Sequence, residues 1–160
     1  MAAKFDFTNS RGFTLIELMI TLAMITILAG TAGPMFLNYA TRAKTSEAMI
    51  GLNKMTEGEV SIFTRSGNFL EAGPANIPPS SNKVIVDFDT DPNWKTINFG
   101  FDGPIYFGYQ AVANGTNAID CEALGDLDGD TVLSTFRRSV QSQNGGTPQA
   151  GGVFVFDELE

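Results

Sequence analysis

The amino-acid sequence predicts an α+β fold, in which one long N-terminal helix packs against a small antiparallel β-sheet. The first observation behind this prediction is a run of twenty residues from Leu18 to Leu37 that carries no charge. The second is an amphipathic pattern that continues from this run toward Ser66. The third is a set of short strand-like runs, separated by glycine-rich and proline-containing turns, in the rest of the chain. Together they predict a helix whose first half is exposed and whose second half is covered by a globular head.

The helix is expected to run from about Thr14 to Ser66 and to stop near Gly67-Asn68. Its uncharged first part is long enough to cross a bilayer core of roughly 30 Å. In the second part, the helical spacing gathers apolar residues on one face, namely Met49, Leu52, Met55, Val60 and Phe63. Glu59 falls inside this apolar face, and the pattern does not explain it.

Three residues in the uncharged part of the helix weaken its regularity. Pro34 removes one amide donor and crowds the preceding turn, and Gly30 and Gly33 are entropically unfavourable in a helix. The sequence therefore predicts a kink or local unwinding between Gly30 and Pro34.

The head is expected to begin with a linker and to continue as a sheet. Residues 67–82 are rich in glycine, proline and serine, which predicts a loop. Strands are expected over residues 83–88, 96–101, 105–112, 132–138 and 153–156. Phenylalanines at strand spacing are expected to fill the core of the head, namely Phe99, Phe101, Phe107, Phe154 and Phe156.

Composition excludes several classes of function. The net charge of −8 opposes bulk binding of nucleic acid, and the adjacent Arg137 and Arg138 are more typical of a solvated strand or loop. The chain has no histidine, which removes Ser-His-Asp and Cys-His catalysis and every metal site that needs an imidazole ligand. Cys121 is the single cysteine and is predicted to be a small buried residue. These features favour a structural or interaction protein over an enzyme, and no organic cofactor is expected.

Glu17 stands at the edge of the uncharged run, where an ionisable side chain needs a partner. At the centre of a membrane helix such a group costs roughly 2.5–3.5 kcal/mol, and less near an edge. A cleavable secretory signal is a poor fit, because residues 29–33 contain no clean A-x-A site and Thr31 stands where a lipoprotein would need cysteine. A conventional secretory signal therefore does not account for the uncharged run.

The segment Gly12-Phe13-Thr14-Leu15-Ile16-Glu17 resembles the cleavage and methylation motif of type IV prepilins and of the related pseudopilins of type II secretion. The resemblance covers about residues 11–65 well and the remainder only in general plan. It implies that a membrane peptidase cuts between Gly12 and Phe13 and methylates the new amino group of Phe13. Pro34, the twenty-second residue counted from Phe13, stands where this family usually carries a helix-bending proline. Many pilins staple a C-terminal loop with a cysteine pair, and the lone Cys121 departs from that pattern.

The resemblance divides the chain into a cleaved leader (1–12), an apolar transmembrane and assembly half of the helix (13–37), an amphipathic half (38–66), and a linker with a sheet head (67–160). Cleavage would create an ammonium group on Phe13. In a bundle of parallel helices, this group of a neighbouring subunit is expected to pair with Glu17 and to fix the axial register. A contact within one helix, over four residues, is the competing interpretation. Glu17 and Pro34 are thus the predicted assembly residues.

The resemblance implies a structural subunit of a type IV pilus-like filament, which serves motility, adhesion, DNA uptake or secretion. The expected partners are copies of the chain and related pilins, the prepilin peptidase and methyltransferase, an inner-membrane assembly platform and the membrane itself. The subunit would be stored in the inner membrane with its leader in the cytoplasm, and would end in an extracellular or periplasmic filament. The alternative is a pseudopilin of a type II secretion system. A more distant alternative is a single-pass membrane protein that displays a cation-binding head.

Asp126, Asp128 and Asp130 lie at alternate positions of a predicted turn, an arrangement that can converge on a hard cation such as Ca²⁺. The segment is not an EF-hand, because Gly129 precedes the third aspartate and Arg137 occupies the twelfth position. A solvated acidic turn between two strands is the competing interpretation.

Overall fold

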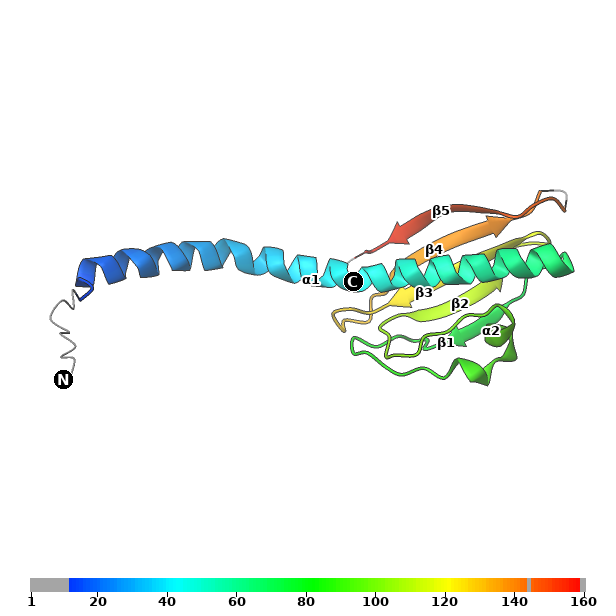
Figure 1. The fold of residues 1–160 in the computed structure, drawn as a ribbon, viewed down its shortest axis with the longest axis horizontal. Helices are drawn as coiled ribbons and strands as arrows, with labels where there is room; N and C mark the ends of the chain where they lie inside the picture. Colours follow the sequence, from blue (N-terminus) through cyan, green and yellow to red (C-terminus); the bar gives the residue numbers. More distant parts are fainter. Residues whose placement is uncertain (1–11, 144, 159–160) are drawn as a thin grey trace, which may run out of the picture. The chain divides into compact units, whose positions relative to one another are not determined.

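The computed structural model describes residues 12–143 and 145–158, and the chain divides between Asn38 and Tyr39 into two compact units. The predicted leader, apart from Gly12, lies outside the described residues. The elements, drawn in Figure 1, are α1 (Leu15–Ser66), β1 (Ala72–Ala75), the 3₁₀ helix η1 (Phe88–Thr90), α2 (Pro92–Thr96), β2 (Gly108–Ala113), β3 (Ala118–Gly125), β4 (Ser134–Gln141) and β5 (Gln149–Phe156). The α+β fold and the single long helix predicted from the sequence are confirmed.

The first unit holds the N-terminal part of α1. Its described side chains are all exposed, including the whole apolar run from Leu18 to Leu37. The helix is long and apolar enough to cross a membrane, with a mean hydropathy of 2.0 over its most apolar window.

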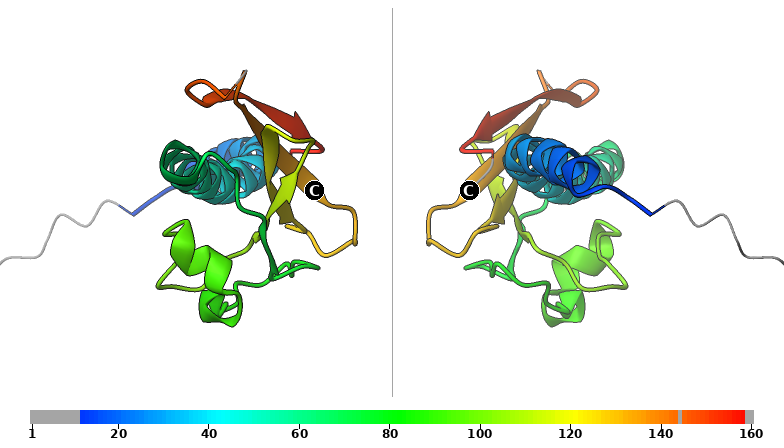
Figure 2. Two further views of the ribbon diagram at one scale, coloured as in Figure 1. Left: turned by 90° about the vertical axis from the view of Figure 1, so that its right-hand side faces the viewer. Right: turned by 90° about the vertical axis from the view of Figure 1, so that its left-hand side faces the viewer.

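The second unit, the head, contains the rest of α1 and a five-stranded antiparallel sheet. The strand order β1-β2-β3-β4-β5 follows the sequence, so each strand pairs with its neighbour along the chain. The part of α1 within the head lies against one face of this sheet and leaves the opposite face uncovered (Figure 2). Residues of α1 also reach the sheet directly, since Arg138 Nη1 donates to Asn53 Oδ1 at 2.6 Å.

The core lies between α1 and the sheet. It gathers Leu52 and Met55 of α1 with sheet residues such as Ile119 and Cys121, and with a group of aromatic rings. Tilted or edge-on ring pairs connect Phe88, Trp94, Phe99 and Tyr109, with 4.9–5.7 Å between the ring centroids of each pair. Such pairs add to the free energy gained by burial alone. Cys121 is buried as predicted.

Two glycines of α1 allow close packing on the head. A Cβ on Gly58 would lie 2.2 Å from the carbonyl oxygen of Ile97, and a Cβ on Gly51 would lie 2.3 Å from the ring of Tyr109. Gly58 therefore lets α1 approach Ile97, the residue that follows α2, and α1 stays regular at this point.

Two predicted strands are wrong. Residues 83–88 form only an isolated bridge, between Val84 and Ile105, before η1 begins at Phe88; residues 96–101 contain the last residue of α2 and the irregular segment after it. Asp87 and Asp91 cap η1 and α2, because their carboxylates accept the backbone N–H of Asp89 (2.8 Å) and Asn93 (2.9 Å). These capping aspartates, with Pro92 in the first turn, outweigh the alternation of apolar residues. Ile97 and Phe99 still enter the core, but from an irregular segment.

Three other expectations need correction. The segment 67–82 is not all loop, because it contains β1. Strand β3 was not predicted, although its buried Ile119, Cys121 and Ala123 alternate with more polar residues. Phe154 and Phe156 do not fill the core, since their side chains are 72% and 69% exposed. Val153 packs against the core, so Phe154 and Phe156, at the alternate positions of β5, lie on the strand face that points away from α1.

Candidate processing and assembly site

The predicted cleavage junction lies in an exposed, irregular segment. Gly12, Phe13 and Thr14 precede α1 and belong to no helix or strand, and Phe13 is 86% exposed. A Cβ added to Gly12 would meet no atom within 4 Å. Packing in the described part of the chain therefore sets no steric requirement for a glycine at this position.

Thr14 and Glu17 form a reciprocal cap at the start of α1. One oxygen of the Glu17 carboxylate accepts both the backbone N–H (2.8 Å) and the hydroxyl (2.7 Å) of Thr14. The Thr14 hydroxyl in turn accepts the Glu17 N–H at 3.3 Å. This is the capping-box arrangement, which satisfies amide donors that a helix start leaves unpaired. The sequence analysis did not identify this cap, although the spacing of Thr and Glu is its usual signal.

The capping box gives Glu17 a partner within its own chain, Thr14. The sequence analysis considered only the amino group of Phe13 as a partner. The capping box uses only one of the two carboxylate oxygens, and Oε1 has no hydrogen-bond partner among the described residues. Glu17 is also exposed, together with the apolar side chains that follow it. The carboxylate is thus oriented by Thr14 and still accessible to a cation from outside the chain.

Pro34 lies inside a helix that continues without a break from Gly30 through Pro34. The unwinding predicted from sequence is therefore absent from the described chain. Pro34 has no N–H to donate to the carbonyl of Gly30, four positions earlier, and the proline ring crowds that carbonyl. No atom outside the helix lies within 4 Å of a Cβ placed on Gly30 or Gly33. Whether the stretch unwinds in a filament stays a prediction.

The three aspartates lie in the loop between β3 and β4, where one oxygen of each falls within 4.8 Å of the others. Each carboxylate already accepts one backbone N–H, from Gly129 (2.7 Å) to Asp126, from Asp130 (3.2 Å) to Asp128, and from Val132 (2.7 Å) to Asp130. The second oxygens remain for a cation. The same hydrogen bonds are those of a solvated acidic turn, so the calcium site also stays a prediction.

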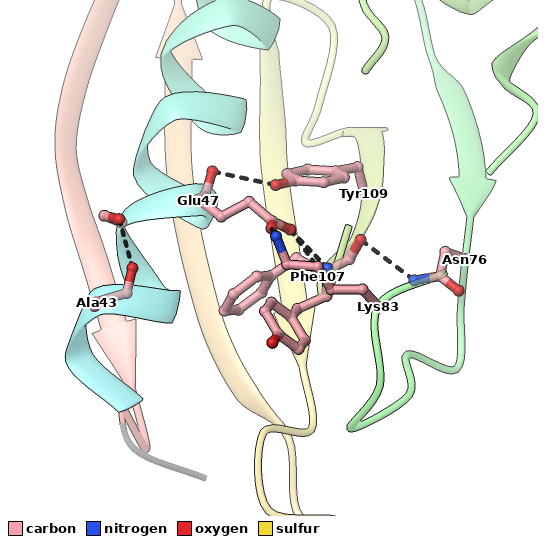
Figure 3. Close-up of polar contacts among 8 residues, drawn as sticks. Ala43, Glu47, Asn76, Lys83, Phe107 and Tyr109 are labelled. Atoms are coloured by element: carbon pink, nitrogen blue, oxygen red, sulfur yellow. Dashed lines mark hydrogen bonds and ion pairs between the residues drawn. The ribbon is translucent and has the colours of Figure 1, made fainter. Parts of the chain in front are cut away.

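Glu47 joins α1 to the connection that leads into β2, as Figure 3 shows. Its carboxylate accepts the backbone N–H groups of Tyr106 (2.8 Å) and Phe107 (3.2 Å), and Lys83 Nζ lies 3.9 Å away. The Tyr109 hydroxyl donates to the backbone carbonyl of Glu47 at 3.2 Å. Burial, together with the Glu47 charge, raises the pKa of Tyr109 far above its usual range, so the hydroxyl remains a donor. Sequence analysis did not identify this contact, because its partners lie about sixty residues apart.

Glu59, the exception in the apolar face, is fully buried in the head. Its Oε2 accepts the backbone N–H of Leu70 at 3.1 Å, and its Oε1 has no hydrogen-bond partner among the described residues. Burial outweighs this hydrogen bond and raises the pKa of Glu59 to about 7. Burial and the neighbouring Glu59 raise the pKa of the Cys121 thiol to about 12, which keeps the thiol protonated and unreactive.

Comparison with known proteins gives a family model and several relatives. Residues 7–33 match the prokaryotic N-terminal methylation motif. The chain is 43% identical over 61 residues to the type IV major pilin protein PilA of Myxococcus xanthus, which covers 38% of this chain and 28% of that protein. It is 37% identical over 86 residues to a fimbrial protein of Neisseria meningitidis, covering 49% and 48% of the two chains.

A longer match is with the type IV major fimbrial protein FimA of Dichelobacter nodosus, which is 32% identical over 121 residues, covering 68% of each chain. The chain thus spans between about a quarter and two thirds of the lengths of these relatives. No solved structure matches the chain significantly.

Proposed function

The chain belongs to the type IV pilin family, and from this premise we propose that it is the structural, non-enzymatic subunit of a type IV pilus-like filament. The observation that carries the proposal is the fully exposed, apolar N-terminal part of α1, which follows Gly12 and Phe13 and begins with the Thr14–Glu17 cap. The relatives are described as major pilins or fimbrial proteins, which favours a pilus over the pseudopilus alternative.

Processing would start at the exposed junction. A membrane peptidase is proposed to cut between Gly12 and Phe13 and to methylate the new amino group of Phe13. An irregular and accessible backbone supports this step, because exposed segments of this kind are preferred sites of proteolytic cleavage. The capping box then holds the start of α1 immediately beyond the cut, so that the new amino terminus would stand next to Thr14, the residue that caps Glu17.

Assembly would exchange one apolar environment for another. The exposed apolar side chains of residues 18–37 can be accommodated in lipid or against the same helices of neighbouring subunits. The inner membrane is the proposed store, and a filament at the cell surface is the proposed product. The assembly platform and the peptidase are proposed partners on the ground of family membership.

Glu17 would select the axial position of each incoming subunit. Its carboxylate has one oxygen engaged by Thr14 and one oxygen without a described partner. The ammonium group of Phe13 from a neighbouring subunit is the proposed partner of that free oxygen. An ion pair removed from water is strongly position-dependent, and so it supplies register more than net stability.

The first test is the mass of the N-terminal peptide from protein sheared off the cell surface. The expected peptide begins at Phe13 and is heavier by one methyl group. A start near residues 31–34, or an intact Met1 found only in membranes, would instead indicate a secreted or anchored domain. Filament length on the cell surface separates a pilus from a short pseudopilus.

The second test concerns register. Glu17→Gln keeps the side-chain shape but removes its charge, and is expected to reduce incorporation into filaments by about tenfold or more. Glu57→Gln, an exposed glutamate on the same helix, is the matched control and should assemble normally. Normal incorporation of Glu17→Gln would contradict the role proposed for the ion pair.

A further inference from the structure

The face of the sheet that points away from α1 carries a trough along β4 and β5. Two adjoining hollows, each with a volume of about 630 Å³, share Ser139 and Phe154 in their linings. Concave sites of roughly 300–1,000 Å³ are typical of small-molecule binding. No part of the processing and assembly site described above contributes to this trough.

A glycine-rich irregularity in β5 keeps the floor of the trough open. The register shifts between Arg138 and Val140, so that Gly151 and Gly152 lie opposite the single residue Ser139. A Cβ on Gly152 would meet no atom within 4 Å. Glycines at such a bulge often mark a place where a ligand approaches the backbone closely. The folding of the head does not explain a bare backbone at Gly152, because a larger side chain would fit there.

The first hollow is polar but uncharged. Its described lining offers amide and hydroxyl groups from Gln141, Gln143, Gln149, Thr147 and Ser139, and contains no ionisable side chain. This is unusual in a chain with a net charge of −8. A charged ligand would find no counter-charge here, whereas the hydroxyl groups of a neutral ligand would find both donors and acceptors.

The second hollow contains charges, but they are satisfied within the protein. The Asp120 carboxylate accepts Asn114 Nδ2 at 3.0 Å and the Ser139 hydroxyl at 2.5 Å. Arg137 Nε donates to Glu122 Oε1 at 2.6 Å. These hydrogen bonds hold the polar groups in fixed positions beside the trough, which reduces the entropy lost on binding.

The trough also has an aromatic wall. Phe154 and Phe156, two residues apart on one face of β5, expose most of their rings beside the polar groups. Neighbouring rings of this kind form an apolar platform that is costly to leave in water. A ligand that suits both features presents a flat apolar side to the rings and hydroxyl groups to the amides.

We propose that this trough binds a neutral oligosaccharide, with Phe154 stacking on the C–H face of a sugar ring and the glutamine amides bonding to its hydroxyl groups. A peptide added as a strand would instead pair with the free backbone edge of β5 and would not need the hollow or the bare glycines. The inference does not depend on the proposed function, because binding is a property of the head alone.

The test uses the full chain in a zwitterionic detergent without sugar head groups. Binding of maltotriose, chitotriose and N-acetyllactosamine is followed by saturation-transfer NMR and by titration. At least one of them is expected to bind in the millimolar range. Phe154→Ala, which removes the stacking ring, and Gly152→Leu, which fills the floor, are each expected to weaken that binding by roughly tenfold or more.

Two variants serve as matched controls. Ile85→Ala removes an exposed apolar side chain, and Gly103→Leu adds a side chain at another open glycine, both away from the trough. Both should leave binding unchanged. Failure of all three saccharides to bind would overturn the proposal, as would binding that survives both trough variants. Loss of self-association in Phe154→Ala without saccharide binding would also overturn it, by assigning this face to contacts between copies of the chain.

Discussion

The two halves of α1 differ in how their apolar side chains are covered, although they belong to one uninterrupted helix. In the N-terminal half every described side chain is exposed, whereas in the head Leu52, Met55 and Phe63 are buried. The head supplies its own cover through the sheet and a cluster of aromatic rings. The N-terminal half has no cover within the described chain, so lipid or other subunits have to provide it.

Each half also contains a glutamate, and the two glutamates differ in exposure and in hydrogen bonding. Glu17 is exposed, and a local cap from Thr14 orients it. Glu59 is fully buried, and only the N–H of Leu70 binds its carboxylate. The comparison teaches that the helix carries one carboxylate whose partner can come from another molecule and one whose surroundings are fixed by the fold. Four measurements would break or sharpen this contrast.

The largest expected effect is a pH dependence caused by Glu59. Its pKa of about 7 in the folded head exceeds the ordinary value of 4.5, so the folded state holds this proton more tightly than the unfolded state does. The contribution of protonated Glu59 to the free energy of unfolding is therefore fully present below about pH 4.5. It falls as the pH rises to about 7, and it does not change further above that pH. The total loss is roughly 3 kcal/mol in the free energy of unfolding.

Urea unfolding of the full chain in detergent, followed by near-UV circular dichroism between pH 4 and 8, measures this slope. Glu59→Gln should remove most of it, whereas Glu57→Gln, which changes an exposed carboxylate, should keep it. Asp120 and Arg138 influence the same region of the core and remain in both variants. Identical slopes in the wild type and Glu59→Gln would show that Glu59 is not the group responsible.

A pair of glycine substitutions compares the two halves by packing. Gly58→Ala would place a Cβ 2.2 Å from the backbone oxygen of Ile97. The strain exceeds the gain of about 1 kcal/mol that alanine brings to a helix, for a net loss of about 2 kcal/mol in head stability. Gly30→Ala meets no atom outside its helix and should leave head unfolding unchanged. Equal effects of the two substitutions on the urea midpoint would contradict the contrast.

Glu47→Ala tests how the head is attached to its part of α1. The change leaves the backbone N–H groups of Tyr106 and Phe107 without their carboxylate acceptor. Water can replace part of this contact, so we expect a loss of about 1–2 kcal/mol in the free energy of unfolding. Ser46→Ala, whose hydroxyl donates only to the nearby Ala43 carbonyl, is the control. Unchanged unfolding of Glu47→Ala would mean that this junction is not a point of attachment.

The smallest expected effect concerns the β3–β4 loop. If Ca²⁺ binds Asp126, Asp128 and Asp130, the head should melt a few degrees higher in calcium than in a chelator. Asp128→Asn should abolish this difference. A melting temperature that does not respond to calcium would leave the loop as a solvated acidic turn.

The sequence predicted the helix well because one strong signal covers it. The uncharged run is long enough to cross a membrane as a helix, the amphipathic pattern after it has helical period, and α1 ends at Ser66, just before Gly67, as expected. The sheet was predicted less well. Capping by Asp87 and Asp91 competes with alternation over residues 83–101, and β3 is built largely from small residues that give a weak strand signal.

The motif around the predicted cleavage junction can be recognised from sequence, because it is local and continuous. The surroundings of Glu47 and Glu59 could not, since their partners depend on how α1 packs on distant parts of the chain. The exposure of Phe154 and Phe156 was also beyond pattern analysis. Alternation shows that two residues share a face, but it does not show which face the helix covers.

The nearest-neighbour strand order has a consequence for how the head is made. Every pairing joins strands that follow one another in the sequence, so the sheet needs no long-range crossover to form. The β2–β3, β3–β4 and β4–β5 pairings join strands separated by short connections, and local pairings of this kind favour rapid folding. The β1–β2 pairing instead closes over the segment that holds η1 and α2, so it is the non-local step among the described strands, whereas β5, with its aromatic wall and open edge, joins the sheet through a short connection.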